Sequence, residues 1–207
     1  MKAYKNIILV VALVFAAGAG GGDSSVSTFT DKRDGKTYKI VKIGRQNWFA
    51  ENLNYATEEG SVFGNVCYEN KAENCAKYGR LYNWETALTA CPAGTHLPTD
   101  KEWTTLVDYA GGEEKAGTKL KSSTGWKCYK ELAAGTNDYG FFALPGSCDG
   151  GGVSKAGNKA GKCGNWWSAT EDGDDAAWSY YTLCNYEGVD RNAYSKYALF
   201  SVRCVKD

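Results

Sequence analysis

The chain has 207 residues, of which 43% are hydrophobic and 23% are charged, so it has enough apolar side chains for a packed core and too many for wholesale disorder. Lys and Arg total 24, Asp and Glu also total 24, and the formal net charge is zero. A neutral chain has no field that attracts polyanions, and we therefore expect no nucleic-acid partner.

The first residues have the order of a secretory signal peptide. Lys2 and Lys5 precede an apolar run over residues 7–17, and small residues follow that run. The run is shorter than the roughly 20 apolar residues that span a bilayer. We therefore predict a signal peptide over residues 1–19 and a secreted or cell-surface protein.

The region after the signal peptide is rich in Gly and Ser. We predict a flexible tether over residues 20–30 and a single domain over residues 31–207. The first cysteine of the chain is Cys67, so no acyl chain has an attachment site in the tether. We therefore expect no stable lipid anchor.

The cysteines of the exported part favour disulfides, because their number is even and exported chains meet an oxidising environment. The only histidine is His96, so a zinc site has too few partners. The position of His96, beside Leu97-Pro98 and before a predicted helix cap, favours a packed or surface histidine with a local hydrogen bond over a general base. The eight cysteines are Cys67, Cys75, Cys91, Cys128, Cys148, Cys163, Cys184 and Cys204.

Two disulfides have a local argument. Cys67 and Cys75 bracket a short polar loop, and this favours a bond between them. Cys91 follows a predicted helix and Cys204 lies in the last predicted strand, so a bond between them would tie the C-terminus to the helical region. Spacing leaves the other pairings open. These concern Cys128, Cys148, Cys163 and Cys184.

The first half of the domain predicts one hairpin and two helices. Apolar residues over 38–43 and 46–50 predict two strands joined at Gly44, and residues 52–74 are polar and loop-like. Residues 85–91 predict a helix that ends before a proline. A second helix over 100–110 begins with a capping box, in which the side chains of Thr99 and Glu102 satisfy each other's amides; its apolar face has helical spacing.

The second half predicts short strands between Gly-, Asn- and Asp-rich loops. The strands cover residues 139–144, 165–170, 177–184 and 197–205, with a loop over 185–197. Because the helices precede the strands, we expect an α+β domain with an antiparallel sheet.

Several phrases of the sequence occur in the order of a known family. They are Asp34-Gly35-Lys36-Thr37-Tyr38, Trp48-Phe49-Ala50-Glu51-Asn52-Leu53-Asn54, Tyr78-Gly79-Arg80-Leu81-Tyr82, Cys91-Pro92, His96-Leu97-Pro98, Glu102-Trp103, Asp138-Tyr139-Gly140-Phe141, Trp167-Ser168-Ala169-Thr170 and Ser201-Val202-Arg203-Cys204-Val205. In these phrases the chain resembles the Fibrobacter succinogenes major paralogous domain family from about residue 31 to the C-terminus.

The resemblance implies a fold. The family is similar to the sulfatase-modifying-factor branch of the C-type-lectin-like fold, which has two main helices, a twisted antiparallel sheet and a loop-rich ligand face. Members are exported, often as lipoproteins, and the missing lipid-attachment cysteine departs from that habit. The expected architecture is thus a disulfide-bonded, lectin-like α+β domain.

Aromatic and polar side chains concentrate in the last part of the chain. In a strand about half of them face the core, and we expect Trp167 and Phe200 to be buried. Tyr, Trp, Asn and Arg give binding surfaces rigid area and adaptable hydrogen bonds. We therefore predict a non-catalytic binding module that recognises a glycan or a surface protein. The predicted ligand-binding residues are Trp166, Trp178, Tyr180, Asn185, Tyr186, Asp190, Arg191, Asn192 and Tyr194.

Three alternatives stay open. The fold resemblance implies a relative of formylglycine-generating thiol oxidases, which need a reactive copper-holding cysteine pair; the cysteines concerned are Cys184 and Cys204. A structural, self-assembling cell-surface subunit is the second alternative. We expect no cofactor. The third alternative, to this last expectation, is a calcium ion bound at the Asp172–Asp175 loop, where several carboxylates lie near Gly173 in the sequence.

Overall fold

The fold begins with the β-hairpin that the sequence predicts. A computed structural model describes residues 27–57, 64–128, 135–146 and 160–207. Strands β2 (Thr37–Ile43) and β3 (Gln46–Phe49) pair antiparallel across a turn at Gly44, whose φ of +60° lies in the left-handed region that favours glycine. Both predicted strands are confirmed.

The predicted tether ends earlier than residue 30. Strand β1 (Ser27–Thr30) pairs antiparallel with β2 and sets Phe29 opposite Tyr38. The ring of Phe29 also packs on Phe49, with 5.5 Å between the ring centroids. The tether prediction over 20–30 is therefore wrong for its last four residues, because the Phe29 side chain packs on the sheet and the backbone of these residues pairs with β2. The predicted signal peptide lies outside the described residues.

A five-stranded antiparallel sheet forms around this hairpin. Its strand order is β1-β2-β3-β11-β6. Strand β11 (Val205–Lys206) inserts between β3 and β6 (Thr95–His96). The last residues of the chain are thus built into the sheet that begins the domain.

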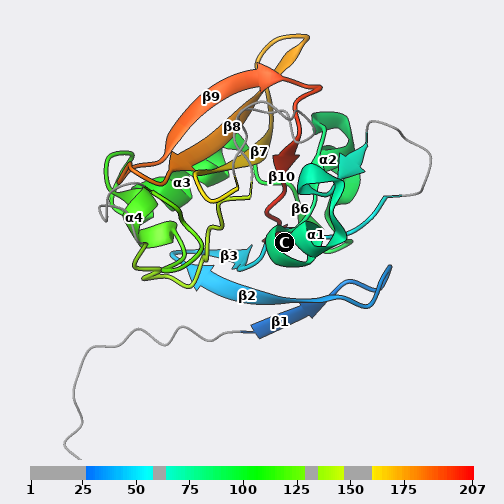
Figure 1. Cartoon of the computed structure of the whole chain (residues 1–207), viewed down its shortest axis with the longest axis horizontal. Helices are drawn as coiled ribbons and strands as arrows, with labels where there is room; N and C mark the ends of the chain where they lie inside the picture. Colours follow the sequence, from blue (N-terminus) through cyan, green and yellow to red (C-terminus); the bar gives the residue numbers. More distant parts are fainter. Residues whose placement is uncertain (1–26, 58–63, 129–134, 147–159) are drawn as a thin grey trace, which may run out of the picture.

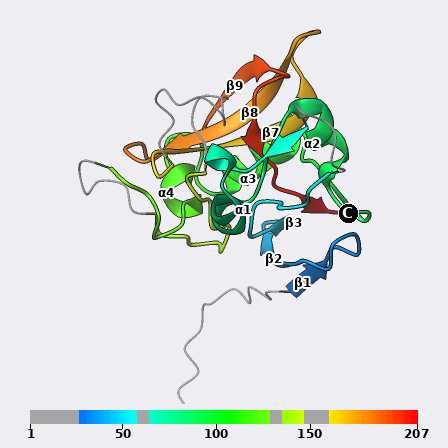
Figure 2. The same ribbon diagram turned by 45° about the vertical axis from the view of Figure 1, so that its right-hand side comes forward.

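A second sheet holds six strands, in the order β4-β5-β10-β7-β8-β9. Its strands are β4 (Asn65–Val66), β5 (Leu81–Tyr82), β10 (Phe200–Ser201), β7 (Cys163–Glu171), β8 (Ala176–Leu183) and β9 (Asp190–Ser195). Strands β10 and β7 pair in parallel. The expectation of one antiparallel sheet is therefore corrected to two sheets, one of them mixed. Figures 1 and 2 place β7–β9 at one end of the molecule and β1–β3 at the other, with helices between them.

The two predicted helices are confirmed as α2 (Trp84–Ala90) and α3 (Asp100–Tyr109). At the start of α3 the amide of Glu102 donates to Thr99 Oγ1 at 3.3 Å, and the amide of Thr99 donates to Glu102 Oε2 at 2.8 Å. Three short helical segments were not predicted. They are the 3-10 helix η1 (Tyr68–Asn70), α1 (Ala72–Tyr78) and α4 (Ala116–Leu120).

The six-stranded sheet separates two apolar clusters. Adjacent residues on β7 point to opposite faces, and Trp166 joins the cluster that contains Trp103 of α3. Trp167 joins the cluster that contains Trp84 of α2. Helices α3 and α2 thus cover opposite faces of the sheet. Trp167 and Phe200 are both 0% exposed, which confirms their predicted burial.

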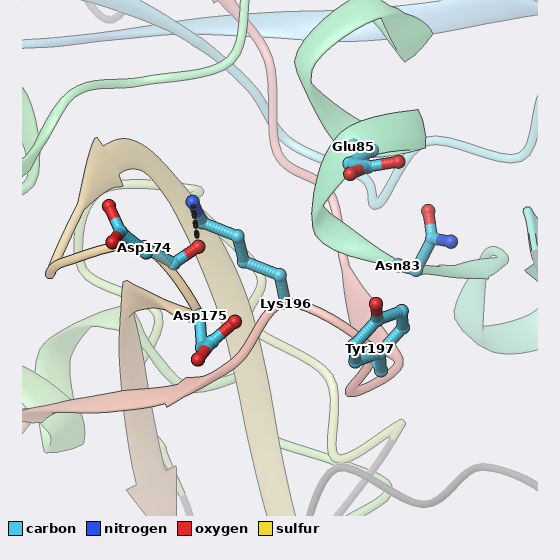
Figure 3. A pocket seen from close by; sticks show the side chains of 6 residues that line it. All are labelled: Asn83, Glu85, Asp174, Asp175, Lys196 and Tyr197. Carbon is cyan, nitrogen blue, oxygen red and sulfur yellow. Dashed lines mark hydrogen bonds between the residues drawn. The ribbon is translucent and has the colours of Figure 1, made fainter.

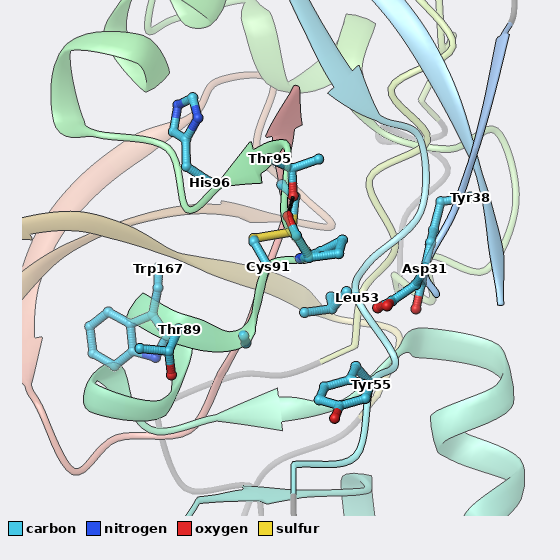
Figure 4. Close-up of a disulfide and its surroundings, with 12 residues drawn as sticks. Asp31, Tyr38, Leu53, Tyr55, Thr89, Cys91, Thr95, His96 and Trp167 are labelled. Atoms are coloured by element: carbon cyan, nitrogen blue, oxygen red, sulfur yellow. Dashed lines mark hydrogen bonds between the residues drawn. A yellow bond between two sulfur atoms is a disulfide. The ribbon is translucent and has the colours of Figure 1, made fainter. Parts of the chain in front are cut away.

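Disulfides connect the helical and C-terminal parts. Both predicted pairs, Cys67–Cys75 and Cys91–Cys204, are present. A third bond joins Cys128 and Cys184, a pairing that spacing left open. Figure 4 shows the Cys91–Cys204 disulfide among Leu53, Thr95 and Trp167. The remaining two cysteines are Cys163, which is also disulfide-bonded, and Cys148, which lies outside the described residues.

Three predictions of strands and loops are wrong. Residues 139–144 form a single bridge, Lys121 to Ala143, instead of a strand. Residues 197–205 divide into β10 and the start of β11, which belong to different sheets, because the buried segment 202–204 carries the chain from one sheet to the other. The predicted loop over 185–197 contains strand β9. In the described part of the chain no helix is long and apolar enough to cross a membrane.

Candidate functional site

Most of the predicted ligand-binding residues lie on the β-hairpin of β8 and β9. The antiparallel register sets Tyr180 opposite Arg191 and Tyr181 opposite Asp190. Opposite residues share a face of a sheet, and successive residues alternate between faces. The predicted residues therefore divide between two faces. We call the face that packs toward α3 the inner face, and the outer face is the one that carries Tyr181, Asp190, Asn192 and Tyr194.

Two predicted binding residues belong to the core of the inner face. Trp166 is 2% exposed and Tyr180 is 3% exposed, so their predicted place on a binding surface is wrong. The physical reason is α3, whose Trp103 stacks on the Tyr180 ring with 5.1 Å between centroids. The indole of Trp166 donates to Asn52 Oδ1 at 2.8 Å. Both rings therefore hold the fold and do not contact solvent.

The rim of the inner face is an ion pair on an aromatic ring. The Arg191 guanidinium lies 3.9 Å from the centre of the Trp178 ring and 2.7 Å from Asp100 Oδ2, at the first turn of α3. The Tyr180 hydroxyl donates to Asp100 Oδ1 at 2.7 Å. Burial raises the pKa of Tyr180 to about 12, so this hydroxyl keeps its proton at neutral pH. Arg191 and Trp178 thus fasten β9 to α3.

The outer face gathers partly exposed tyrosines around one carboxylate. The hydroxyl of Tyr186 donates to Asp190 Oδ1 at 2.9 Å, and this hydrogen bond raises the pKa of Tyr186. Burial raises the pKa of Tyr181, and Asp190 adds to the shift. Asn192 is exposed, and the half-buried Tyr194 ring packs edge-on against Phe200 at 5.1 Å. The sequence predicts a binding role for Tyr186, Asp190, Asn192 and Tyr194, but not for Tyr181.

A buried acceptor lies next to this cluster. Asn165 on β7 is opposite Tyr181 on β8 and is 3% exposed. Its Oδ1 atom has no hydrogen-bond partner in the described part of the chain. An unpaired buried acceptor is costly, so it favours any donor that reaches it.

The loop between β8 and β9 accepts hydrogen bonds from the buried Lys121. The Lys121 ammonium donates to the carbonyl oxygens of Leu183 at 3.2 Å and Tyr186 at 2.5 Å. Burial lowers the pKa of Lys121 to about 8. The exposed Asn185 follows Cys184, which is disulfide-bonded. These contacts restrain the loop, and the sequence gives no signal for the role of Lys121.

The acidic loop forms the turn between β7 and β8. Lys196 donates to the Asp174 carbonyl at 2.8 Å and lies 3.3 Å from Glu171 Oε2. Figure 3 shows Lys196 beside Asp174 and Asp175, with Glu85 of α2 and the N-cap residue Asn83 across a hollow of about 70 Å³. Among the described residues, no group of three or more His, Cys, Asp or Glu side chains is placed to hold a metal. Calcium at this loop stays a prediction.

The histidine connects α3 to the C-terminus. His96 Nε2 lies 2.8 Å from Glu102 Oε1, and Nδ1 lies 2.6 Å from Asp207 Oδ1. Burial lowers the pKa of His96, but the hydrogen bonds to Asp207 and Glu102 outweigh it and raise the pKa overall. The local hydrogen bonds predicted for this histidine are thus present, and its structural role stays a prediction.

The fold and the hairpin define a class of protein: a disulfide-crosslinked α+β domain that displays one face of a β-hairpin. The family model described as the Fibrobacter succinogenes major domain matches residues 41–206. The chain therefore belongs to this family, as its phrases indicate. No curated protein and no solved structure shows significant similarity to the chain. The C-type-lectin-like detail stays an implication of the resemblance.

Proposed function

We propose that this protein is an exported, non-catalytic module that binds a glycan through the outer face of the β8–β9 hairpin. The observation that carries the proposal is the cluster of partly exposed Tyr181 and Tyr186 rings around the Asp190 carboxylate. The N-terminal sequence and the disulfides support export, because disulfides persist in oxidising compartments.

The chemistry of the outer face suits a hydroxyl-rich ligand. Tyrosine rings offer apolar area for the faces of sugar rings, and their hydroxyls exchange hydrogen bonds with sugar hydroxyls. Asp190, Asn192 and Tyr194 alternate along β9, so their side chains form a row with spacings of about 7 Å. The row offers an acceptor, an amide and a ring in turn, which fits an extended saccharide.

The rigidity of the site also favours binding. The β8–β9 loop is held by Lys121 and by the Cys128–Cys184 disulfide. The Thr182 hydroxyl adds a hydrogen bond of 2.6 Å to the Gly188 carbonyl. A surface that is already ordered loses less conformational entropy when a ligand binds. The hairpin therefore meets a physical requirement of a recognition surface.

Binding of the purified, oxidised protein to a panel of immobilised plant and bacterial polysaccharides tests the proposal. Tyr181→Ala and Asp190→Asn should weaken binding about tenfold, because each removes a contact at the centre of the cluster. Tyr109→Ala, a substitution of an exposed tyrosine on α3, is the control and should leave binding unchanged. Absence of binding to every polysaccharide, or equal losses in all three variants, would contradict the proposal.

A protein partner is a second candidate, and the position of β9 favours it. Strand β9 is the last strand of the six-stranded sheet in the described part of the chain, so its outer edge can pair with an added strand. Strand addition uses backbone groups and should be unaffected by Tyr181→Ala, whereas glycan binding should weaken about tenfold. Light scattering separates both from self-assembly, which predicts particles that grow with protein concentration.

A further inference from the structure

A polar pocket lies at the other end of the molecule, between β2 and the C-terminal end of α1. It encloses about 300 Å³, which is the lower limit of typical small-ligand pockets. Figures 1 and 2 show α1 next to the β1–β3 end, away from the β8–β9 hairpin. The residues that line it and enter the argument are Lys36, Tyr38, Glu51, Asn54, Lys77 and Tyr78.

The walls of the pocket are rigid. One wall contains Cys75, which the disulfide to Cys67 ties to the preceding segment. At Gly79 the chain has φ +78°, and a Cβ atom there would lie 2.7 Å from Cβ of Asn52. Only glycine allows this close approach of α1 to residues 52–53. The pocket is therefore a product of the packing and not of a loose loop.

A buried cation lies directly behind the pocket. Arg203 is 0% exposed and donates to Asn52 Oδ1 and to the carbonyl oxygens of Phe49, Phe141 and Phe142. All of these acceptors are neutral, and no carboxylate of the described residues lies within ion-pair distance. Burial lowers the pKa of Arg203 to about 9, and the charge of the nearby Glu51 offsets only part of that shift. A negative charge in the pocket would therefore stabilise the buried guanidinium.

The pocket itself has more positive than negative groups nearby. Lys77 is exposed and forms no ion pair with a described residue, whereas Lys36 lies 3.0 Å from Asp34. The carboxylate of Glu51 is held by the Lys39 amide at 2.8 Å. Among the charged residues that line the pocket, Lys36 and Lys77 are cationic and Glu51 is anionic, and the Lys77 ammonium, 4.9 Å from the centre of the Tyr78 ring, has no carboxylate partner among the described residues.

The remaining groups match a sugar ring. Glu51 and the Asn54 side chain can exchange hydrogen bonds with hydroxyl groups, and the rings of Tyr38 and Tyr78 give the pocket apolar walls. The volume admits one monosaccharide unit. We propose that this pocket binds a hexuronate, with the sugar carboxylate at Lys77 and the ring hydroxyls at Glu51 and Asn54. The inference is independent of the glycan site on the outer face.

Calorimetric titration of the full chain with D-glucuronate and D-galacturonate, each beside its neutral hexose, tests the inference. We expect saturable binding of at least one hexuronate and none of D-glucose or D-galactose. Lys77→Gln should weaken binding about tenfold, because it removes a charge-assisted hydrogen bond. The control is Lys101→Gln, which neutralises an exposed lysine on α3 and should have no effect.

The outcomes separate the possible ligands. Equal binding of acetate would overturn the sugar component, and equal binding of the neutral hexoses would overturn the charge component. Absence of hexuronate binding, or equal behaviour of the two lysine variants, would overturn the site. Tyr181→Ala should leave hexuronate binding intact, so failure of the outer-face proposal and failure of this one give different results.

Discussion

Each face of the β8–β9 hairpin has a hydrogen bond from a tyrosine hydroxyl to an aspartate, but the two bonds differ in their surroundings. On the inner face the Tyr180 hydroxyl donates to Asp100, and the ring lies under α3. On the outer face the Tyr186 hydroxyl donates to Asp190, and the ring is partly exposed. The bond lengths are similar, 2.7 and 2.9 Å, so geometry alone does not distinguish them.

What distinguishes the two tyrosine–aspartate pairs is their burial: Tyr180 is 3% exposed beneath α3, whereas Tyr186 and Asp190 are both partly exposed. Under α3 a tyrosine–aspartate pair satisfies buried polar groups and stabilises the fold. Without such a cover, the same pair leaves ring area and hydrogen-bonding capacity for a ligand. The two pairs should therefore respond oppositely to substitution, with stability lost at the Tyr180–Asp100 pair and binding lost at the Tyr186–Asp190 pair.

The largest expected effect is on the inner face. Trp166→Ala should lower the free energy of unfolding by about 4 kcal/mol, because it leaves a cavity beside Trp103 and removes the hydrogen bond to Asn52. Denaturant unfolding under oxidising conditions measures this change. Trp178→Ala, at a partly exposed site of the same face, is the control and should cost less. Equal losses of unfolding free energy in the two variants would contradict the claim that Trp166 belongs to the core and Trp178 to its partly exposed rim.

A smaller effect is expected at the start of α3. Thr99→Ala should lower the free energy of unfolding by about 1 kcal/mol, because the Glu102 amide loses its capping partner. Thr99→Ser retains the hydroxyl and should restore most of the loss. Binding at the outer face should be unchanged by either variant. A loss of binding would mean that the two faces are coupled through α3.

The sequence predicts local structure well for physical reasons. The capping box of Thr99 and Glu102 depends on residues three positions apart, and the β2–β3 hairpin on one turn at Gly44. The pairing of Cys91 with Cys204 followed from their elements, a helix end and a final strand. Each of these inferences needs little knowledge of distant parts of the chain.

The candidate site was harder to predict because it depends on distant segments. Alternation on β7 places Trp166 and Trp167 on opposite faces, but it does not say that both faces are covered. Lys121 reaches the Tyr186 carbonyl from 65 positions away, and Arg203 meets Asn52 across 151 positions. Neither hydrophobic periodicity nor a short sequence motif predicts contacts between residues so far apart in the chain.

The smallest expected effect is a pH dependence of the folding stability, caused by His96 beside the first turn of α3. The folded-state pKa of His96 is raised above its ordinary value of 6.5, so the protonated side chain stabilises the fold. This contribution is fully present below about pH 6.5 and is lost as the pH rises through the folded-state pKa. His96→Gln should therefore flatten the decline of stability above neutral pH in thermal unfolding scans. A parallel decline in both proteins would assign it to another group.

A matched pair of substitutions tests the division of the hairpin most directly. Tyr180→Phe and Tyr186→Phe each remove one hydroxyl, from the inner and the outer face respectively. Unfolding free energies and binding to the polysaccharide panel would be measured for both. We expect Tyr180→Phe to lower stability and retain binding, and Tyr186→Phe to retain stability and weaken binding. The same response from both variants, in either measurement, would contradict the account.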